Sequence, residues 1–264
     1  MSIKETFPRP EDGHYRWPGL RENRDRDLQA MNCLRVISDS MSACELSNID
    51  YASGSWGYTV LRMAYSEESN RLWPVAMDKL KRWVTEYFVH LNRLITNKLD
   101  GTLNDEVARR FVLEVVETDA LRGHELSSKE EDVESLVRIF ETWRRGATGS
   151  TDLDTRDNPR FCDFLVIDED ALRSLAALPD ETPHLGPARI GSYIDSYVWL
   201  VDSRAVNRYH GVEDGDNYDG WMRLCSEDIH HAWFEKAGRS ASDYWTFERR
   251  EIPEGSGIKW YQAR

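Results

Sequence analysis

Residues 161–167 read Phe-Cys-Asp-Phe-Leu-Val-Ile, a nearly continuous apolar run that ends at Asp168. Such a run is typical of a β-strand covered on both faces, because a strand with one solvated face alternates apolar and polar residues. Asp168 is well placed to cap a short helix over residues 169–178. The sequence therefore predicts a central strand that passes directly into a helix.

Further strands and helices are predicted on both sides of this segment. Residues 74–96 repeat apolar side chains every three or four positions, which indicates an amphipathic helix. Residues 57–65 are rich in strand-forming residues. The remaining predicted elements are helices over 25–43, 127–145 and 226–237 and strands over 110–117, 197–201 and 221–225.

The order of these elements predicts an α+β protein with a single mixed β-sheet and helices packed on it. Helices alternate with strands early, and two strands then follow each other with no helix between them. A ferredoxin-like sandwich is favoured, and a doubly wound α/β sheet is the alternative. Residues 1–24 are predicted to form a flexible N-terminal arm, and residues 25–264 a single α+β domain.

Composition limits the class of protein. The chain has 264 residues and a net charge of -13, from 34 Lys and Arg against 47 Asp and Glu. This sign argues against binding to nucleic acid or to anionic lipid, so neither a nucleic-acid nor a membrane partner is predicted. The longest apolar run, Tyr197–Val201, is too short to span a membrane, and the N-terminus lacks an apolar signal segment. A cytoplasmic location is therefore expected.

Known motifs for cofactors and metals are missing from the sequence. It contains no G-x-x-x-x-G-K-[ST] or G-x-G-x-x-G, so no cofactor is predicted. A calcium loop starting at Asp214 would place Cys225 where the bidentate Glu belongs. Weak divalent-ion binding by Asp214, Asp216 and Asp219 is left as the alternative to a solvated turn. The four cysteines form no C-x-x-C pair, and we expect them to be structural.

Several segments in series resemble a large family of uncharacterised proteins from filamentous fungi. They are Gly57-Tyr-Thr-Val-Leu-Arg62, Phe140-Glu-Thr-Trp143, Phe164-Leu-Val-Ile-Asp168-Glu-Asp-Ala-Leu172, Val198-Trp-Leu-Val-Asp202 and Gly220-Trp-Met-Arg-Leu224. The resemblance covers residues 54–237, approximately. It implies a fungal, cytosolic protein of a single domain, and it carries over no catalytic residue, cofactor or activity.

Charged residues at predicted strand ends are the candidates for catalysis. Asp168 follows one strand and Asp202 follows another, and ligands of open sheets sit outside the carboxyl ends of strands. If the two strands are parallel neighbours, the carboxylates converge and could act as acid and base. Arg62 lies in an apolar strand and is expected to pair with one of them, and His230 is a further candidate. The alternative is that Asp168 is a helix cap and Arg62 faces solvent.

Aromatic residues near strands are the candidates for ligand binding. Trp56, Tyr58, Trp199 and Trp221 could line a pocket for a flat metabolite or a peptide. A binding or interaction module is the favoured function, because the sequence carries an aromatic surplus and no nucleophile motif. The alternative is a small-molecule enzyme that uses the strand-end carboxylates, so the sequence leaves open both catalysis and the identity of the partner.

Overall fold

The structure is a computed structural model. It describes residues 30, 33–37, 55–96, 103–122, 126, 130–148, 158–181, 196–210, 219–237 and 247–262. The predicted arm over residues 1–24 lies outside this set, so the proposed domain boundary stays a prediction. Of the helix predicted over 25–43, residues 33–37 are described and are helical.

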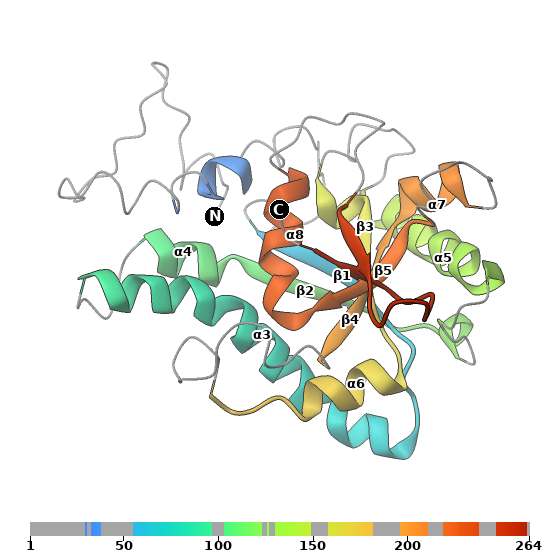
Figure 1. Ribbon diagram of the computed structural model, residues 1–264, viewed down its shortest axis with the longest axis horizontal. Helices are drawn as coiled ribbons and strands as arrows, with labels where there is room; N and C mark the ends of the chain where they lie inside the picture. Colours follow the sequence, from blue (N-terminus) through green and yellow to red (C-terminus); the bar gives the residue numbers. More distant parts are fainter. Residues whose placement is uncertain are drawn as a thin grey trace.

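One mixed sheet of seven strands runs through the described part of the chain (Figure 1). Its order is β2-β1-β3-β4-β5-β7-β6. Strand β1 pairs in parallel with β2 and β3, β4 is antiparallel to both β3 and β5, and β7 is parallel to β5. The strands are β1 (Trp56–Arg62), β2 (Phe111–Val116), β3 (Asp163–Ile167), β4 (Tyr197–Asp202), β5 (Trp221–Cys225), β6 (Arg249–Glu251) and β7 (Lys259–Tyr261).

The predicted class is confirmed, since the described strands form a single mixed sheet with helices packed on it. The preferred ferredoxin-like topology is wrong. That fold is a four-stranded antiparallel sheet, whereas three neighbouring strands are parallel here and the sheet is larger. The doubly wound alternative does not fit either, because β4 is antiparallel to both of its neighbours, β3 and β5.

Helices cover both faces of the sheet (Figure 1). The connections from β1 to β2 and from β2 to β3 run in opposite directions across the sheet, so right-handed crossovers place their helices on opposite faces. We call these the α3 face and the α5 face. The α3 face carries α3 (Glu67–Thr96), α4 (Leu103–Arg109) and α8 (Ile229–Ala237); the α5 face carries α5 (Glu130–Thr148) and α7 (Ser203–Tyr209); α6 (Glu169–Ala176) follows β3.

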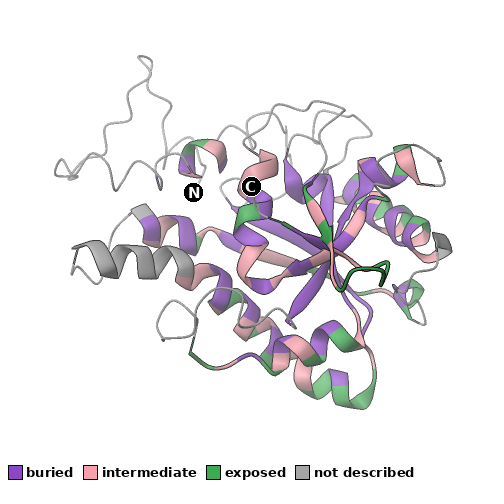
Figure 2. Ribbon diagram, in the orientation of Figure 1, coloured by how far each residue is buried: buried purple, intermediate pink, exposed green. Residues whose placement is uncertain are grey.

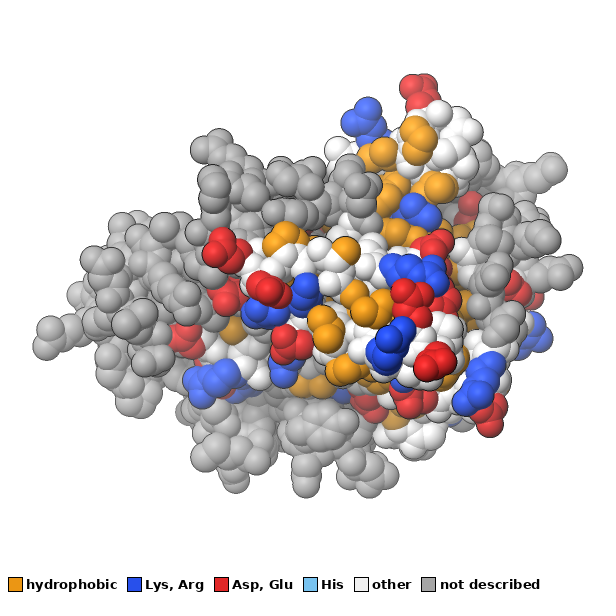
Figure 3. All heavy atoms as spheres, turned by 90° about the horizontal axis from the view of Figure 1, so that it is seen from below, with side chains coloured by type: hydrophobic (Ala, Val, Ile, Leu, Met, Phe, Trp, Pro, Cys, Tyr) orange, Lys and Arg blue, Asp and Glu red, His pale blue; other side chains and the backbone are white. Residues whose placement is uncertain are grey.

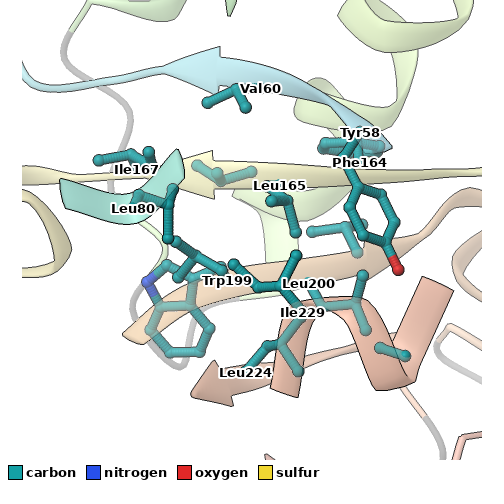
Figure 4. Packing of buried hydrophobic residues seen from close by; sticks show 14 of the residues in the cluster. Tyr58, Val60, Leu80, Phe164, Leu165, Ile167, Trp199, Leu200, Leu224 and Ile229 are labelled. Atoms are coloured by element: carbon teal, nitrogen blue, oxygen red, sulfur yellow. The ribbon is translucent and has the colours of Figure 1, made fainter. Parts of the chain in front are cut away.

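The core lies between the sheet and these helices. The central strands β1, β3 and β4 are buried along their whole length (Figure 2). On the α3 face, Leu80 of α3 and Ile229 of α8 lie among strand residues such as Leu165 and Leu200 (Figure 4). On the α5 face, Phe164 of β3 stacks on Phe140 of α5 with ring centroids 4.5 Å apart. The prediction that residues 161–167 hold a strand covered on both faces is thus confirmed for Asp163–Ile167.

Helix α3 begins at Glu67, seven residues earlier than predicted. Its first turns are polar, so the apolar repeat becomes visible only from Trp73 onward. The helix starts after Ser66, whose Oγ accepts a hydrogen bond from the Ser69 backbone N–H at 3.0 Å. None of the helices in the described ranges is both long and apolar enough to cross a membrane.

Helix α7 lies between β4 and β5, where two strands in direct succession were predicted. That prediction is wrong, because Asp202 ends β4 and also caps the seven-residue α7: its Oδ1 accepts the N–H groups of Arg204 at 3.1 Å and Ala205 at 3.0 Å. Helix α4 and strands β6 and β7 were not predicted. Near the C-terminus, Trp260 and Tyr261 of β7 are buried.

Candidate functional site

The two strand-end carboxylates lie at opposite ends of antiparallel strands. Asp163 at the start of β3 pairs with Asp202 at the end of β4. Asp168 follows the other end of β3. The prediction that Asp168 and Asp202 converge is therefore wrong, because it required β3 and β4 to be parallel.

Both carboxylate oxygens of Asp168 accept hydrogen bonds from within the protein. One carboxylate oxygen accepts the Ala171 backbone N–H at 2.8 Å and so caps α6. The other accepts the indole N–H of Trp199 at 2.7 Å. Burial raises the pKa of Asp168, and these two hydrogen bonds act in the opposite direction. The alternative interpretation of Asp168 as a helix cap is the one that the structure bears out.

Arg62 pairs with neither Asp168 nor Asp202. Its guanidinium forms an ion pair with Glu117 at 2.7 Å and donates from Nε to the Ala64 carbonyl at 2.9 Å. The Trp73 ring stacks on it, with its centroid 4.5 Å from Cζ. The expected pairing is wrong, because the end of β1 lies beside the residues that follow β2 and next to α3.

The remaining polar candidates do not gather into a site. His230 is buried in α8, where its ring centroid lies 3.9 Å from that of His231. Asp214 and Asp216 lie outside the described residues, and Asp219 is exposed before β5. Within the described ranges, no three His, Cys, Asp or Glu side chains form a group that could hold a metal ion.

The described cysteine thiols are not activated. Burial raises the pKa of both Cys33 and Cys225 to about 12, and it also raises the pKa of Cys162. A nucleophilic cysteine needs a lowered thiol pKa, so these three behave as small core residues.

The four aromatic candidates fall on two faces of the sheet and do not line one pocket. On the α3 face, Trp56 and Tyr58 are fully buried, and the Trp56 indole donates to the Val107 carbonyl at 2.6 Å. Trp199 and Trp221 point to the α5 face, because they alternate with the core residues of β4 and β5. The aromatic residues that concern a site are those of the α5 face.

Arg223 lies at the centre of an aromatic cluster on the α5 face. Its Cζ is 4.1 Å from the ring centroid of Tyr197, 5.0 Å from that of Trp199 and 5.5 Å from that of Trp260. Tyr197 meets both tryptophans edge-on, with centroid distances of 5.8 and 5.7 Å. We call these four residues the Arg223 cluster.

The Arg223 guanidinium has no hydrogen-bond acceptor and no counter-ion in the part of the chain that the structure describes. Its Nε is buried and donates to nothing there. Asp168 is near enough for the charge of Arg223 to lower its pKa, but the two form no ion pair. Cation–π contacts stabilise the charge of Arg223 and leave its N–H groups unused.

Four other enclosed arginines of the described chain each pair with a carboxylate. Arg62 pairs with Glu117, Arg110 with Glu106, Arg144 with Glu141 and Arg160 with Glu114. On the surface as well, basic and acidic side chains are intermixed over the described part of the face in Figure 3. Arg223 departs from this pattern in a chain whose net charge is -13.

A groove lies along the hairpin that joins β6 and β7. It has a volume of about 600 Å³ and is lined by residues Arg250 to Glu254 of the β6–β7 hairpin. The Trp260 indole donates to the Ile252 carbonyl at 3.1 Å, which joins the cluster to this hairpin. Arg223, Trp260 and Arg250 are partners across three strands, so their side chains point to the same face.

Sequence reasoning missed Arg223, although it named two neighbouring residues, Trp199 and Trp221. A signal was present: an arginine between Met222 and Leu224 in a strand that alternates must face away from the core side of that strand. The contributions of Tyr197 and Trp260 depend on strand order, which the sequence does not reveal.

The arrangement is suited to recognition of an anion. Guanidinium groups bind carboxylate and phosphate through paired N–H donors, and flanking rings fix the plane of the fork. Fold and site thus define an α+β protein with an arginine–aromatic cluster on the α5 face of its sheet. No protein-family model, curated protein or solved structure matches the chain.

Proposed function

We propose that the protein is a binding module that recognises a partner through an anionic group, a carboxylate or a phosphate, placed on Arg223. The observation that carries this proposal is a half-buried guanidinium enclosed by three aromatic rings with no acceptor in the described chain. A partner's oxygens would supply the missing acceptors.

The energetics favour such a partner. A hydrogen bond to a charged group contributes about 1.5–3 kcal/mol, and a buried donor without an acceptor carries a desolvation cost. The Arg223 cluster already bears that cost before binding, and its rings already hold the side chain. Little further ordering is therefore needed on binding, which favours affinity.

The rings also indicate the shape of the group beside the anion. Tyr197, Trp199 and Trp260 are themselves buried, so a ligand would meet only the small exposed parts of these rings beside Arg223. A flat or apolar group attached to the anion would pack against them, and the groove along the hairpin gives room for the rest of the ligand.

The wider setting is part of the same proposal. We place the protein in the cytoplasm of a filamentous fungus, as a member of the family that its sequence resembles, with a protein or small-molecule partner. Its net charge of -13 supports a partner other than nucleic acid or membrane. The enzyme alternative loses its support, because it relied on the convergence of Asp168 and Asp202.

Calorimetric titration with simple probes tests the proposal. Benzoate joins a flat ring to a carboxylate, phenyl phosphate carries a phosphate, and benzamide is the neutral isostere of benzoate. We expect benzoate or phenyl phosphate to bind at least about tenfold more tightly than benzamide, a difference of about 1.4 kcal/mol. Whichever anion binds more tightly identifies the chemistry of the natural group.

Two variants assign the binding to its site. Arg223→Gln removes the charge and is expected to abolish the preference for the anionic probes. Arg71→Gln removes an exposed arginine of α3 and is expected to bind as the wild type does. Equal affinity of the wild type and Arg223→Gln for all three probes would overturn the proposal.

A further inference from the structure

A second polar cluster lies inside the molecule on the α3 face. Lys236 of α8 donates to Asp163 at 3.0 Å and to Asp202 at 2.6 Å. Tyr58 of β1 lies next to these carboxylates and is fully buried. We call these four residues the buried acid cluster. Neither anion binding at Arg223 nor the enzyme alternative involves all four of these residues.

The two carboxylates of the cluster differ in their partners. Asp202 receives two backbone N–H groups at the start of α7 in addition to Lys236. Asp163 receives Lys236 alone, and its Oδ2 has no donor in the described chain. The hydroxyl of Tyr58, also fully buried, has no acceptor or donor there. A proton on Oδ2 would turn Asp163 into a donor where none of its neighbours supplies one.

Burial and the charge of Asp202 favour such a proton, whereas the charges of Lys236 and Arg204 oppose it. Two carboxylates face one ammonium, so the cluster with every group ionised carries an excess buried negative charge, which is costly. The titratable and charged groups that face it are Tyr58 from β1, Cys162 before β3, Asp202 from β4, Arg204 from α7, Glu235 and Lys236 from α8, and Tyr261 from β7.

We propose that Asp163 holds a proton at neutral pH and releases it to solvent as the pH rises, which makes the buried acid cluster a pH-sensitive fastening of α8 to the sheet. The O–H bond of the carboxyl group is the bond that breaks. The ionised cluster then carries its full excess charge, and α8 is held less firmly. The neighbouring C-terminal segment is involved as well, because Lys236 packs over Phe247 at 5.0 Å and Glu235 accepts from Tyr261 at 2.6 Å.

The pKa values agree with this picture. Burial raises the pKa of Asp163 from 3.8 to about 7, and the charge of Asp202 raises it while that of Lys236 lowers it. The two carboxylates raise the pKa of Lys236 despite its burial, so the ammonium keeps its charge. A carboxyl whose pKa is higher in the folded than in the unfolded state makes stability fall as the pH rises between the two values. The free energy of unfolding is therefore expected to fall as the pH rises from about 4 to about 7.

Carbon-13 NMR of the aspartate carboxyl groups measures the proton directly. We expect one carboxyl resonance to titrate near pH 7 and to be missing from Asp163→Asn. In Asp202→Asn the midpoint of that resonance is expected to fall, because Lys236 then faces a single carboxylate. Titration of Asp163 below about pH 5 in the wild type would overturn the proposal.

The free energy of unfolding across pH 4–8 gives a second readout. Asparagine resembles the protonated carboxyl group, so Asp163→Asn is expected to fold and to lose the decline between pH 4 and pH 7. Asp170→Asn, at an exposed position of α6, is the matched control and should keep the wild-type profile. A profile of Asp163→Asn that runs parallel to the wild-type profile would contradict the proposal.

Discussion

At the scale of single residues, Arg223 is held by rings instead of by a counter-ion. A guanidinium is weakly hydrated and planar, so it tolerates a partly enclosed aromatic site better than an ammonium does. The same geometry leaves its fork of N–H groups without acceptors in the described chain. Both features depend on the guanidinium group, so replacing Arg223 with lysine tests them together.

Arg223→Lys keeps the charge and loses both the fork and the stacking. We expect the affinity for benzoate to fall about tenfold, while the free energy of unfolding changes by less than about 1 kcal/mol. Calorimetry and urea denaturation measure the two quantities, with Arg71→Lys as the control. Unchanged affinity would show that charge alone accounts for binding.

Asp168 is expected to act on stability. Asp168→Ala removes the cap of α6, worth about 1 kcal/mol, and leaves the buried indole N–H of Trp199 without its acceptor, worth about 1–3 kcal/mol. We therefore expect a loss of about 2–4 kcal/mol in urea denaturation. Asp170 lies two residues further along the chain and is exposed. The free energy of unfolding of Asp170→Ala should stay within about 0.5 kcal/mol of that of the wild type. Equal effects of the two substitutions would contradict this assignment.

At the scale of elements, the close approach of β1 and β2 depends on Gly57. Its φ is +127°, and an ideal Cβ there would lie 2.0 Å from the carbonyl oxygen of Val112. Gly57→Ala is expected to destabilise the protein by about 3 kcal/mol or more. Gly146→Ala in α5, where a Cβ meets no atom within 4 Å, is expected to stabilise it by up to about 1 kcal/mol. Thermal denaturation of both variants measures the difference, and equal melting temperatures would contradict it.

The sequence predicted the long elements because they bury a periodic face. Strand β5 was predicted with its observed bounds, and α3 was predicted from its apolar repeat. Helix α7 and strands β6 and β7 are too short to show a periodic pattern of apolar residues, so the sequence did not predict them. Helix α7 is capped by the adjacent Asp202, whereas β6 and β7 are held by strand pairing.

At the scale of the whole molecule, strand direction determined which parts of the site could be predicted. Asp168 and Asp202 were each recognised as residues that end strands, and both do so. Their separation follows from the antiparallel pairing of β3 with β4, which no local signal encodes. The Arg223 cluster needs β4, β5 and β7 side by side, and so it also depends on the order of the sheet.

Strand β7 contributes to the Arg223 cluster and contacts α8, the helix that carries Lys236. Trp260 faces the Arg223 cluster, and the adjacent Tyr261 donates to Glu235 of α8, the neighbour of Lys236. The last strand of the sheet therefore helps to build the proposed binding site on one face while it secures α8 on the other.

Indole N–H resonances in nitrogen-15 NMR spectra test anion binding at the Arg223 cluster, because they report on individual tryptophans during a titration with benzoate. Substitution of each Trp by Phe assigns them. We expect the resonances of Trp199 and Trp260 to shift and saturate together and those of Trp56 and Trp233 on the α3 face to stay unchanged. Arg223→Gln is expected to remove the shifts. Resonances of Trp199 and Trp260 that do not move, or that move equally in Arg223→Gln, would show that the anion does not bind at the Arg223 cluster.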